Sequence, residues 1–136
     1  MWRNLVLSTF LLAAGTSGVA SAQSLSPATS VVWQLQATIP TISGVVELTP
    51  TTDPDQLLGA PGQYIARTNF QDSQGLTGSV EVFADTKSLA ARQAFLTISG
   101  TGSPEHDVAR GTVLLRVYTP AAVPNYDAAF ANLALP

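Results

Sequence analysis

The chain has 136 residues, of which 46% are hydrophobic and only 11% are charged, and it contains no cysteine. Globular proteins carry charged side chains at about 25% of positions. The composition therefore excludes a chain that is disordered throughout, and the few basic residues exclude a nucleic-acid-binding surface. The length suits a single domain, without a disulfide framework, a thiolate nucleophile or a cysteine metal site. The formal net charge of −3 makes the protein mildly acidic.

The first 22 residues have the three parts of a secretory signal peptide. Residues 1–4 carry one positive charge, residues 5–14 are almost entirely apolar, and the segment ends in Ala20-Ser21-Ala22. This apolar core is shorter than the roughly 20 residues that span a bilayer. Cleavage after Ala22 is therefore expected, with no stable transmembrane anchor left on the protein. The sequence predicts a secreted or periplasmic, cell-envelope location.

After the signal peptide, a flexible Ser-, Pro- and Thr-rich tether is expected over 23–30, followed by one domain over 31–136. Residues 31–37 alternate, with Val31, Trp33 and Leu35 on one face, which predicts a strand. Residues 44–48 predict a shorter edge strand or a loop, because prolines flank them.

The middle of the chain predicts a helical turn, a hairpin and a helix. Residues 53–59 suit a single helical turn that Asp53 caps and Gly59 ends. Residues 64–70 and 79–83 have strand patterns around a turn at 71–75, so we expect an antiparallel hairpin. A helix over 87–97 follows, capped by Asp85 or Thr86.

The last third predicts one strand and one helix. Residues 106–118 form the most strand-like run, with apolar residues on both faces, as in a central strand covered at least in part on each side. Val123, Tyr126, Phe130 and Leu133 then follow the apolar stripe of a helix. The order of elements predicts an α+β fold, in which an antiparallel sheet of about four to five strands carries two helices on one face.

One segment resembles a known sequence motif. Residues 53–64, Asp-Pro-Asp-Gln-Leu-Leu-Gly-Ala-Pro-Gly-Gln-Tyr, resemble the pattern DPNxLLGRPxxY of small exported bacterial proteins and lipoproteins of unknown function, which are common in actinobacteria. The resemblance continues to about Tyr126, through Phe70-Gln71-Asp72, Glu81-Val82-Phe83, 89–92, 105–107, 113–117 and Thr119-Pro120.

The resemblance implies an exported protein of this architecture and brings no activity with it. The chain differs from the motif at two positions, because Asp55 replaces the usual Asn and Ala60 replaces the usual Arg. It also lacks the cysteine that carries the lipid in many of these proteins. Any binding role of that arginine is therefore absent here.

No group of residues has the pattern of a known catalytic or metal site. His106 is the only histidine, and as neighbours in a strand Glu105 and Asp107 point away from it. A solvated strand entrance is therefore favoured there. Asp53 and Asp55 lack the spacing of a calcium loop, and zinc needs three or four converging ligands. Neither a metal nor another cofactor is predicted.

Other motifs point to structure more than to chemistry. No serine lies in a Gly-x-Ser-x-Gly motif, and the glycines of residues 99–103 lack the lysine of a phosphate-binding loop. Arg67 and Arg116 are charges within predicted strands. Either is expected to form a cross-strand pair with Asp72, Glu81 or Asp107.

The sequence therefore favours a non-catalytic secreted or envelope-associated protein, a binding or accessory module for a protein or a cell-surface component. The candidate partner-binding residues are Trp33, Leu57, Leu58, Pro61 and Tyr64, although core packing is the expected role of Trp33 and of the two leucines. The oligomeric state stays open.

Two alternatives remain at this point. A small extracytoplasmic hydrolase would use two carboxylates among Asp53, Asp55, Glu105 and Asp107, at least one of them with a raised pKa. A carrier of a small apolar ligand would need an internal pocket between the sheet and the helices.

Overall fold

The computed structural model describes residues 24–99, 106–118 and 123–136. The predicted signal peptide lies outside them. The elements in chain order are α2 (Pro27–Thr38), β1 (Ile42–Glu47), β2 (Tyr64–Asp72), β3 (Thr77–Phe83), α3 (Thr86–Ile98), β4 (His106–Arg110), β5 (Val113–Val117) and α4 (Val123–Ala131). No helix in these ranges is both long and apolar enough to cross a bilayer.

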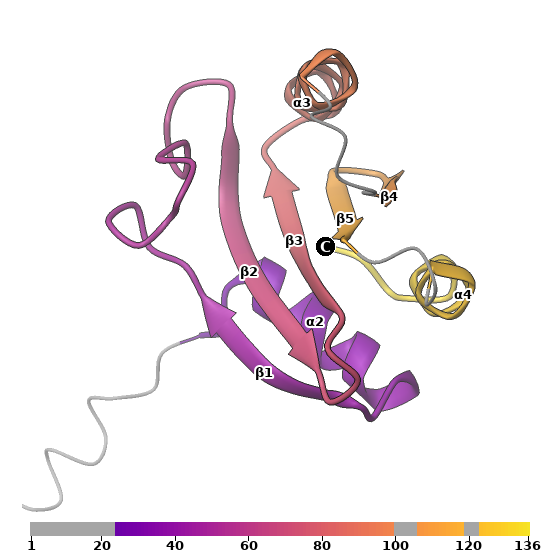
Figure 1. Cartoon of the computed structure of the whole chain (residues 1–136). Helices are drawn as coiled ribbons and strands as arrows, with labels where there is room; N and C mark the ends of the chain where they lie inside the picture. Colours follow the sequence, from indigo (N-terminus) through magenta and orange to yellow (C-terminus); the bar gives the residue numbers. More distant parts are fainter. Residues whose placement is uncertain (1–23, 100–105, 119–122) are drawn as a thin grey trace, which may run out of the picture.

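The five strands form one sheet in the order β1-β2-β3-β5-β4, with every pair antiparallel (Figure 1). The predicted α+β fold with an antiparallel sheet is confirmed. The hairpin of β2 and β3 forms as expected, and the Asp85 side chain caps α3 by accepting a hydrogen bond from the backbone N–H of Ser88. β3 is the central strand.

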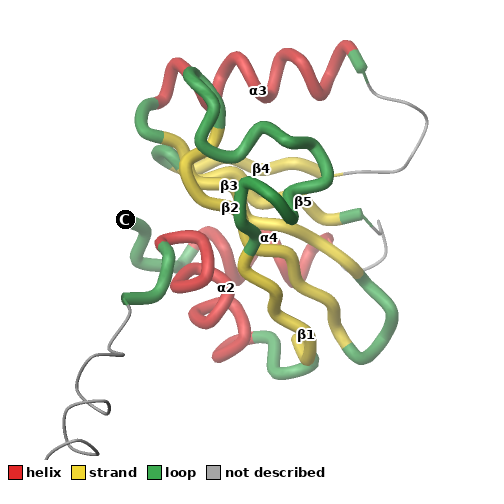
Figure 2. The backbone as a smooth tube through the Cα atoms, turned by 90° about the vertical axis from the view of Figure 1, so that its left-hand side faces the viewer, coloured by secondary structure: helices red, strands yellow, loops and turns green. Residues whose placement is uncertain are grey.

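Helices cover both faces of the sheet. Apolar side chains of β3 and β5, including Val80 and Leu115, form one core with α2 and α4. Leu114 points to the opposite face, where it packs with Leu89 of α3. Figure 2 shows α3 on one side of the sheet and α2 and α4 on the other. The prediction that both expected helices share one face is therefore wrong, because helical periodicity identifies a helix's apolar side but not the sheet face that it covers.

The first predicted strand is instead the helix α2. Ser26 caps it by accepting a hydrogen bond from the backbone N–H of Thr29, and Pro27 occupies the first turn. The helix begins within the predicted tether, so residues 27–30 are not a flexible linker. Its buried residues include Ala28, Val31, Val32 and Leu35, which recur at helical spacing. Val31, Trp33 and Leu35 also recur at every second position, which fits a strand equally well. The Ser26 cap decides for the helix.

The last predicted strand is two strands. β4 and β5 form a hairpin in which Arg110 pairs with Val113. Gly111 lies in the turn at a φ of +58°, a conformation that glycine adopts without the steric cost of a side chain. The glycine therefore ends one strand and begins the next, which the apolar pattern alone does not indicate.

A close contact between neighbouring strands leaves no room for a side chain at Gly78. Phe70 pairs with Gly78 across the β2–β3 ladder, and its ring stacks on Tyr126 with 5.5 Å between centroids. A Cβ atom at Gly78 would lie 2.7 Å from the Arg116 carbonyl oxygen and would collide with the Phe70 ring. Phe70 therefore occupies the space that a side chain at this position would need.

We expect Gly78→Ala to lower the free energy of unfolding by about 1–3 kcal/mol, the usual cost of overpacking a core. Chemical denaturation followed by circular dichroism measures the change. Gly44→Ala is the matched control, because its Cβ would meet only Gln71, at an ordinary 3.6 Å. Equal stability of the two variants would contradict this account of Phe70.

Candidate functional site

The sheet face toward α3 is charged at its centre. Arg67 of β2, Glu81 of β3 and Arg116 of β5 project from it, and Arg92 reaches it from α3. With Asp53 and Asp55 of the loop over 48–63, these residues form an ionic network that we call the charge cluster. All of its members except Asp55 are buried.

Glu81 lies at the centre of the charge cluster. Its Oε1 accepts hydrogen bonds from Arg92 and Arg116, each at 2.9 Å, and its Oε2 accepts one from the Nε of Arg92 at 3.1 Å. Arg67 lies 3.8 Å from the same Oε1. Three guanidinium groups thus surround one buried carboxylate. The predicted cross-strand pairing of Arg67 and Arg116 with Glu81 is confirmed.

Asp53 and Asp55 hold the loop onto this cluster. Asp55 Oδ2 accepts hydrogen bonds from Arg67 at 2.6 Å and from Arg92 at 3.1 Å. Asp53 accepts hydrogen bonds from Arg67 and from the backbone N–H groups of Leu57 and Leu58. Asp53 therefore caps a series of turns, and the predicted helical turn over 53–59 does not form.

The two loop carboxyls have lowered pKa values. Burial alone would raise the pKa of Asp53, but the hydrogen bonds from Tyr64, Leu57 and Leu58 outweigh it and hold the pKa below the usual 3.8. Burial would likewise raise the pKa of Asp55, and Arg67 and Arg92 lower it. Both carboxyl groups are therefore ionised at neutral pH and accept hydrogen bonds. A general acid needs the opposite shift, a raised pKa.

Tyr64 is enclosed by the cluster. Its hydroxyl donates to Asp53 Oδ2 at 2.7 Å and accepts from Arg67 at 3.1 Å. The guanidinium carbons of Arg67 and Arg92 lie 5.6 Å and 5.4 Å from its ring centroid. Burial, followed by the hydrogen bond to Asp53, raises the pKa of Tyr64 far above its usual range. Tyr64 thus supports the cluster and is not exposed to a partner.

The structure brings only part of the candidate partner-binding set together, because Leu57 and Leu58 pack against the core cluster that contains Tyr64. Trp33 lies on α2, across the sheet from the loop, and is 45% exposed, so its expected place in the core is wrong. Leu57 and Leu58 are half-buried against the core beneath α3, whereas Pro61 is exposed.

Other candidate groups lie apart from one another. His106 hydrogen-bonds Asp127 of α4, with 3.0 Å from its Nε2 to each carboxylate oxygen. Asp107 points to the opposite face, 3.5 Å from Arg116 Nε, as strand alternation predicts. Glu105 lies outside the described residues. Asp72 pairs with no arginine in the described ranges, and it accepts a hydrogen bond from the Tyr126 hydroxyl.

Arg92 is the member of the charge cluster whose role the sequence analysis did not identify. It lies within the predicted helix over 87–97, at helical spacing from Leu89, Phe95 and Leu96. Leu89 and Arg92 are buried, whereas Phe95 is 58% exposed. A charged residue within an apolar stripe is the available signal, since a buried arginine requires an acidic partner on the surface that the helix covers.

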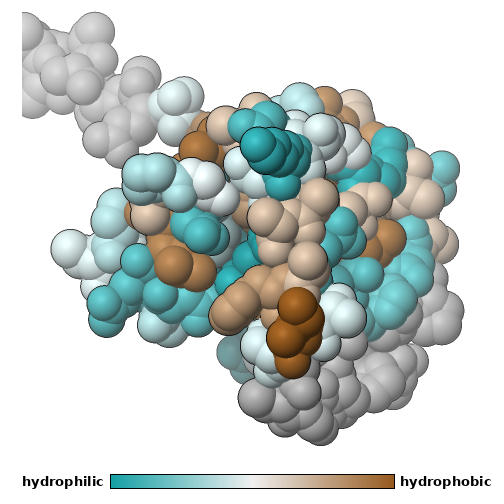
Figure 3. Space-filling view, turned by 90° about the horizontal axis from the view of Figure 1, so that it is seen from above, coloured by the Kyte–Doolittle hydropathy of each residue, from teal (hydrophilic) through white to brown (hydrophobic). Residues whose placement is uncertain are grey.

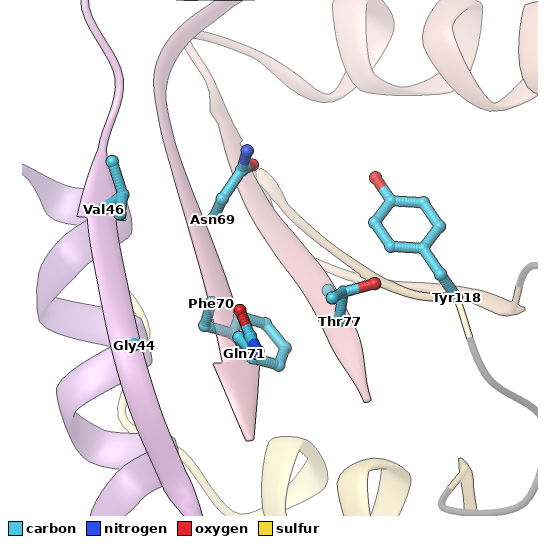
Figure 4. A pocket seen from close by; sticks show the side chains of 8 residues that line it. Gly44, Val46, Asn69, Phe70, Gln71, Thr77 and Tyr118 are labelled. Atoms are coloured by element: carbon cyan, nitrogen blue, oxygen red, sulfur yellow. The ribbon is translucent and has the colours of Figure 1, made fainter. Parts of the chain in front are cut away.

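Beyond the charge cluster, the same face of the sheet is open and hollowed. A groove of about 360 Å³ is lined by Gly44, Val46, Asn69, Phe70, Gln71, Thr77, Gly78 and Tyr118, and we call it the sheet groove. Figure 4 shows Asn69, Gln71 and Thr77 projecting from β2 and β3, with Tyr118 at one side. The Tyr118 hydroxyl hydrogen-bonds Ser79, and the Arg116 guanidinium lies over its ring at 5.4 Å.

The outer side of α3 carries a smaller, apolar hollow. A groove of about 200 Å³ lies between the helix, at Ala91 and Phe95, and the loop, at Leu57. Hydrophobic residues lie over this end of the molecule among hydrophilic ones (Figure 3). A further groove, of about 480 Å³, lies beside α4 and the end of α2. The groove beside α4 has no aromatic residue in its lining, and the hollow beside α3 combines Phe95 with two polar side chains, Gln63 and Arg92.

Within the described ranges, no three His, Asp or Glu side chains come together as a metal site. Comparison of the chain with protein-family models, with curated proteins and with solved structures found no match.

We expect Glu81→Gln to lower the free energy of unfolding by about 3 kcal/mol, because it leaves three buried guanidinium groups around a neutral amide. Urea denaturation at neutral pH measures the loss. Asp127→Asn makes the same chemical change in a partly exposed pair and should cost less than about 1 kcal/mol. Similar losses in both variants would show that the cluster contributes no more than a surface pair.

The lowered pKa of Asp53 makes stability depend on pH. As the pH is lowered below about 5, the unfolded chain binds a proton at Asp53 before the folded protein does. The free energy of unfolding therefore decreases as the pH decreases. We expect Asp53→Asn to be less stable at pH 7 and to show a shallower fall between about pH 5 and 3. Asp55→Asn should change the slope less, because Asp55 is 40% exposed. Unfolding curves over this pH range that are parallel for Asp53→Asn and wild type would refute this assignment.

Proposed function

We propose that the protein is a non-catalytic binding module of the cell envelope or the extracellular space, and that it holds its partner in the sheet groove. The envelope location follows from the predicted signal peptide and from the motif over 53–64. The groove carries the binding role. This assignment moves the expected partner-binding surface away from Tyr64, whose hydroxyl and ring are already engaged within the charge cluster.

The observation that supports this function is the unused hydrogen-bonding capacity of the groove. In the described part of the chain, the Gln71 amide and the Thr77 hydroxyl have no hydrogen-bond partner, although both project into the groove (Figure 4). The Asn69 carbonyl accepts from Arg67, and its amino group is available to a ligand. Polar groups gathered in a concave surface are the usual means by which a site orients a ligand.

The chemistry beside the groove favours binding over catalysis. The carboxylates on the same face of the sheet, those of the charge cluster and that of Asp107, lie beside arginines. The groove is lined by amides, a hydroxyl, a phenol and apolar groups, and none of its side chains carries a charge. Acid–base catalysis requires a group that titrates near the working pH, and the lining offers none.

The proposal is tested by filling the groove. Gly44 lines it and accepts a Cβ atom without a clash, so Gly44→Phe should occupy the groove and leave the fold intact. Ala90→Phe adds the same ring at an exposed position of α3. We expect the full-length protein and Ala90→Phe to co-sediment with the envelope fraction of the producing organism, and Gly44→Phe to lose at least nine-tenths of this binding. Equal co-sedimentation of all three proteins would overturn the proposal.

A further inference from the structure

We infer that the ligand of the sheet groove is a neutral saccharide of the cell envelope, bound through about one or two sugar residues. This inference rests on the proposed binding function and names the chemical class of the partner. Four features of the groove lead to it: its lack of charge, its amide and hydroxyl groups, its aromatic ring and its place on the face of the sheet.

The arginines beside the groove favour a ligand without net charge, because carboxylates already pair with them. Arg67 and Arg116 border the groove through their contacts with Asn69 and Tyr118. Each already has carboxylate partners, Arg67 in Asp53 and Asp55 and Arg116 in Glu81. An anionic ligand would have to compete with these carboxylates, and a cation would meet the arginines. A ligand without net charge meets neither cost.

The polar side chains of the groove match the hydroxyl groups of a sugar. The amides of Asn69 and Gln71 and the hydroxyl of Thr77 each donate and accept hydrogen bonds. A sugar hydroxyl also does both, so neighbouring hydroxyls on one ring can pair with the two ends of one amide. These side chains stand on adjacent strands, since Gln71 pairs with Thr77 in the β2–β3 ladder. A rigid sheet thus fixes their spacing.

Tyr118 supplies the apolar part of the site. One face of a sugar ring carries mainly C–H groups, and such a face packs on an aromatic ring, whose π-surface is electron-rich. The Tyr118 ring is held in place by its hydroxyl contact with Ser79 at 3.1 Å and by the Arg116 guanidinium at 5.4 Å. Val46 adds a second apolar wall from β1. The volume of about 360 Å³ is at the small end of ligand sites, which suits one or two rings.

The position of the groove favours a saccharide over an extended peptide. Peptides that bind to sheets add a strand at an open edge, where backbone groups are unpaired. The sheet groove lies instead over β2 and β3, whose backbone groups pair with the strands on both sides. A ligand in the groove therefore meets side chains rather than backbone hydrogen bonds.

The test separates the envelope by chemistry. The envelope of the producing organism is digested with protease, and its glycans are divided by anion exchange into a neutral and an acidic fraction. Both fractions and an undigested envelope-protein fraction are immobilised, and binding of the full-length protein is measured on each. We expect binding to the neutral fraction, and at least tenfold weaker binding for Gly44→Phe and Tyr118→Ala than for wild type and Ala90→Phe.

A second pair of variants keeps the test independent of folding defects. Tyr118→Phe retains the ring and loses only the hydroxyl contact with Ser79, so it should bind the neutral fraction more tightly than Tyr118→Ala. Amide NMR shifts on adding neutral glycan should concentrate in β1, β2 and β3. Unfolding curves confirm that each variant is folded.

The outcomes distinguish the two proposals. Binding to the acidic glycan fraction or to the protein fraction alone, weakened by Gly44→Phe, would overturn the proposal of a neutral saccharide and leave the binding function in place. Binding that Gly44→Phe does not weaken would overturn the groove as the site, and with it both proposals. Absence of binding to every fraction would also overturn both.

Discussion

Glu81 lies in the central strand with its carboxylate fully buried, and a charge in that position needs partners from every element that covers it. The neighbouring strands supply Arg67 and Arg116, and α3 supplies Arg92. A shift of one residue in the register of β3 would turn Glu81 toward the apolar face that α2 and α4 cover. The buried charge therefore specifies both the strand register and the face on which α3 packs.

The loop over 48–63 follows from the same constraint. Three arginines around one glutamate leave an excess of positive charge, and Asp53 and Asp55 supply the missing carboxylates. Directly after Asp55, the backbone takes a left-handed conformation at Gln56, with a φ of +57°. Asp53 offsets this by accepting the backbone hydrogen bonds of Leu57 and Leu58. The most distinctive motif of the sequence thus has a structural role.

Sequence patterns predicted those elements whose local signals agree with one another. The β2–β3 hairpin and α3 have clear alternation, turn residues and a cap, and each appears as expected. The segment 31–37 fits two periods, and only the Ser26 cap and the packing of Val32 decide for a helix. The charge cluster was predicted only in its cross-strand pairs. The contact of Arg92 with Glu81 joins α3 to the strand before it, so no pattern within a single element contains it.

The chemistry of the sheet groove depends on the completeness of the charge cluster. Arg67 reaches toward the groove with its Nε on Asn69, and Arg116 lies against Tyr118. Without their carboxylate partners, these two arginines would make the open half of the sheet a cationic surface that attracts anions. With Asp53, Asp55 and Glu81 in place, they instead orient an amide and an aromatic ring, and the surface remains neutral. Burying the opposing charges at the centre of the sheet is what leaves a polar, uncharged groove beside them.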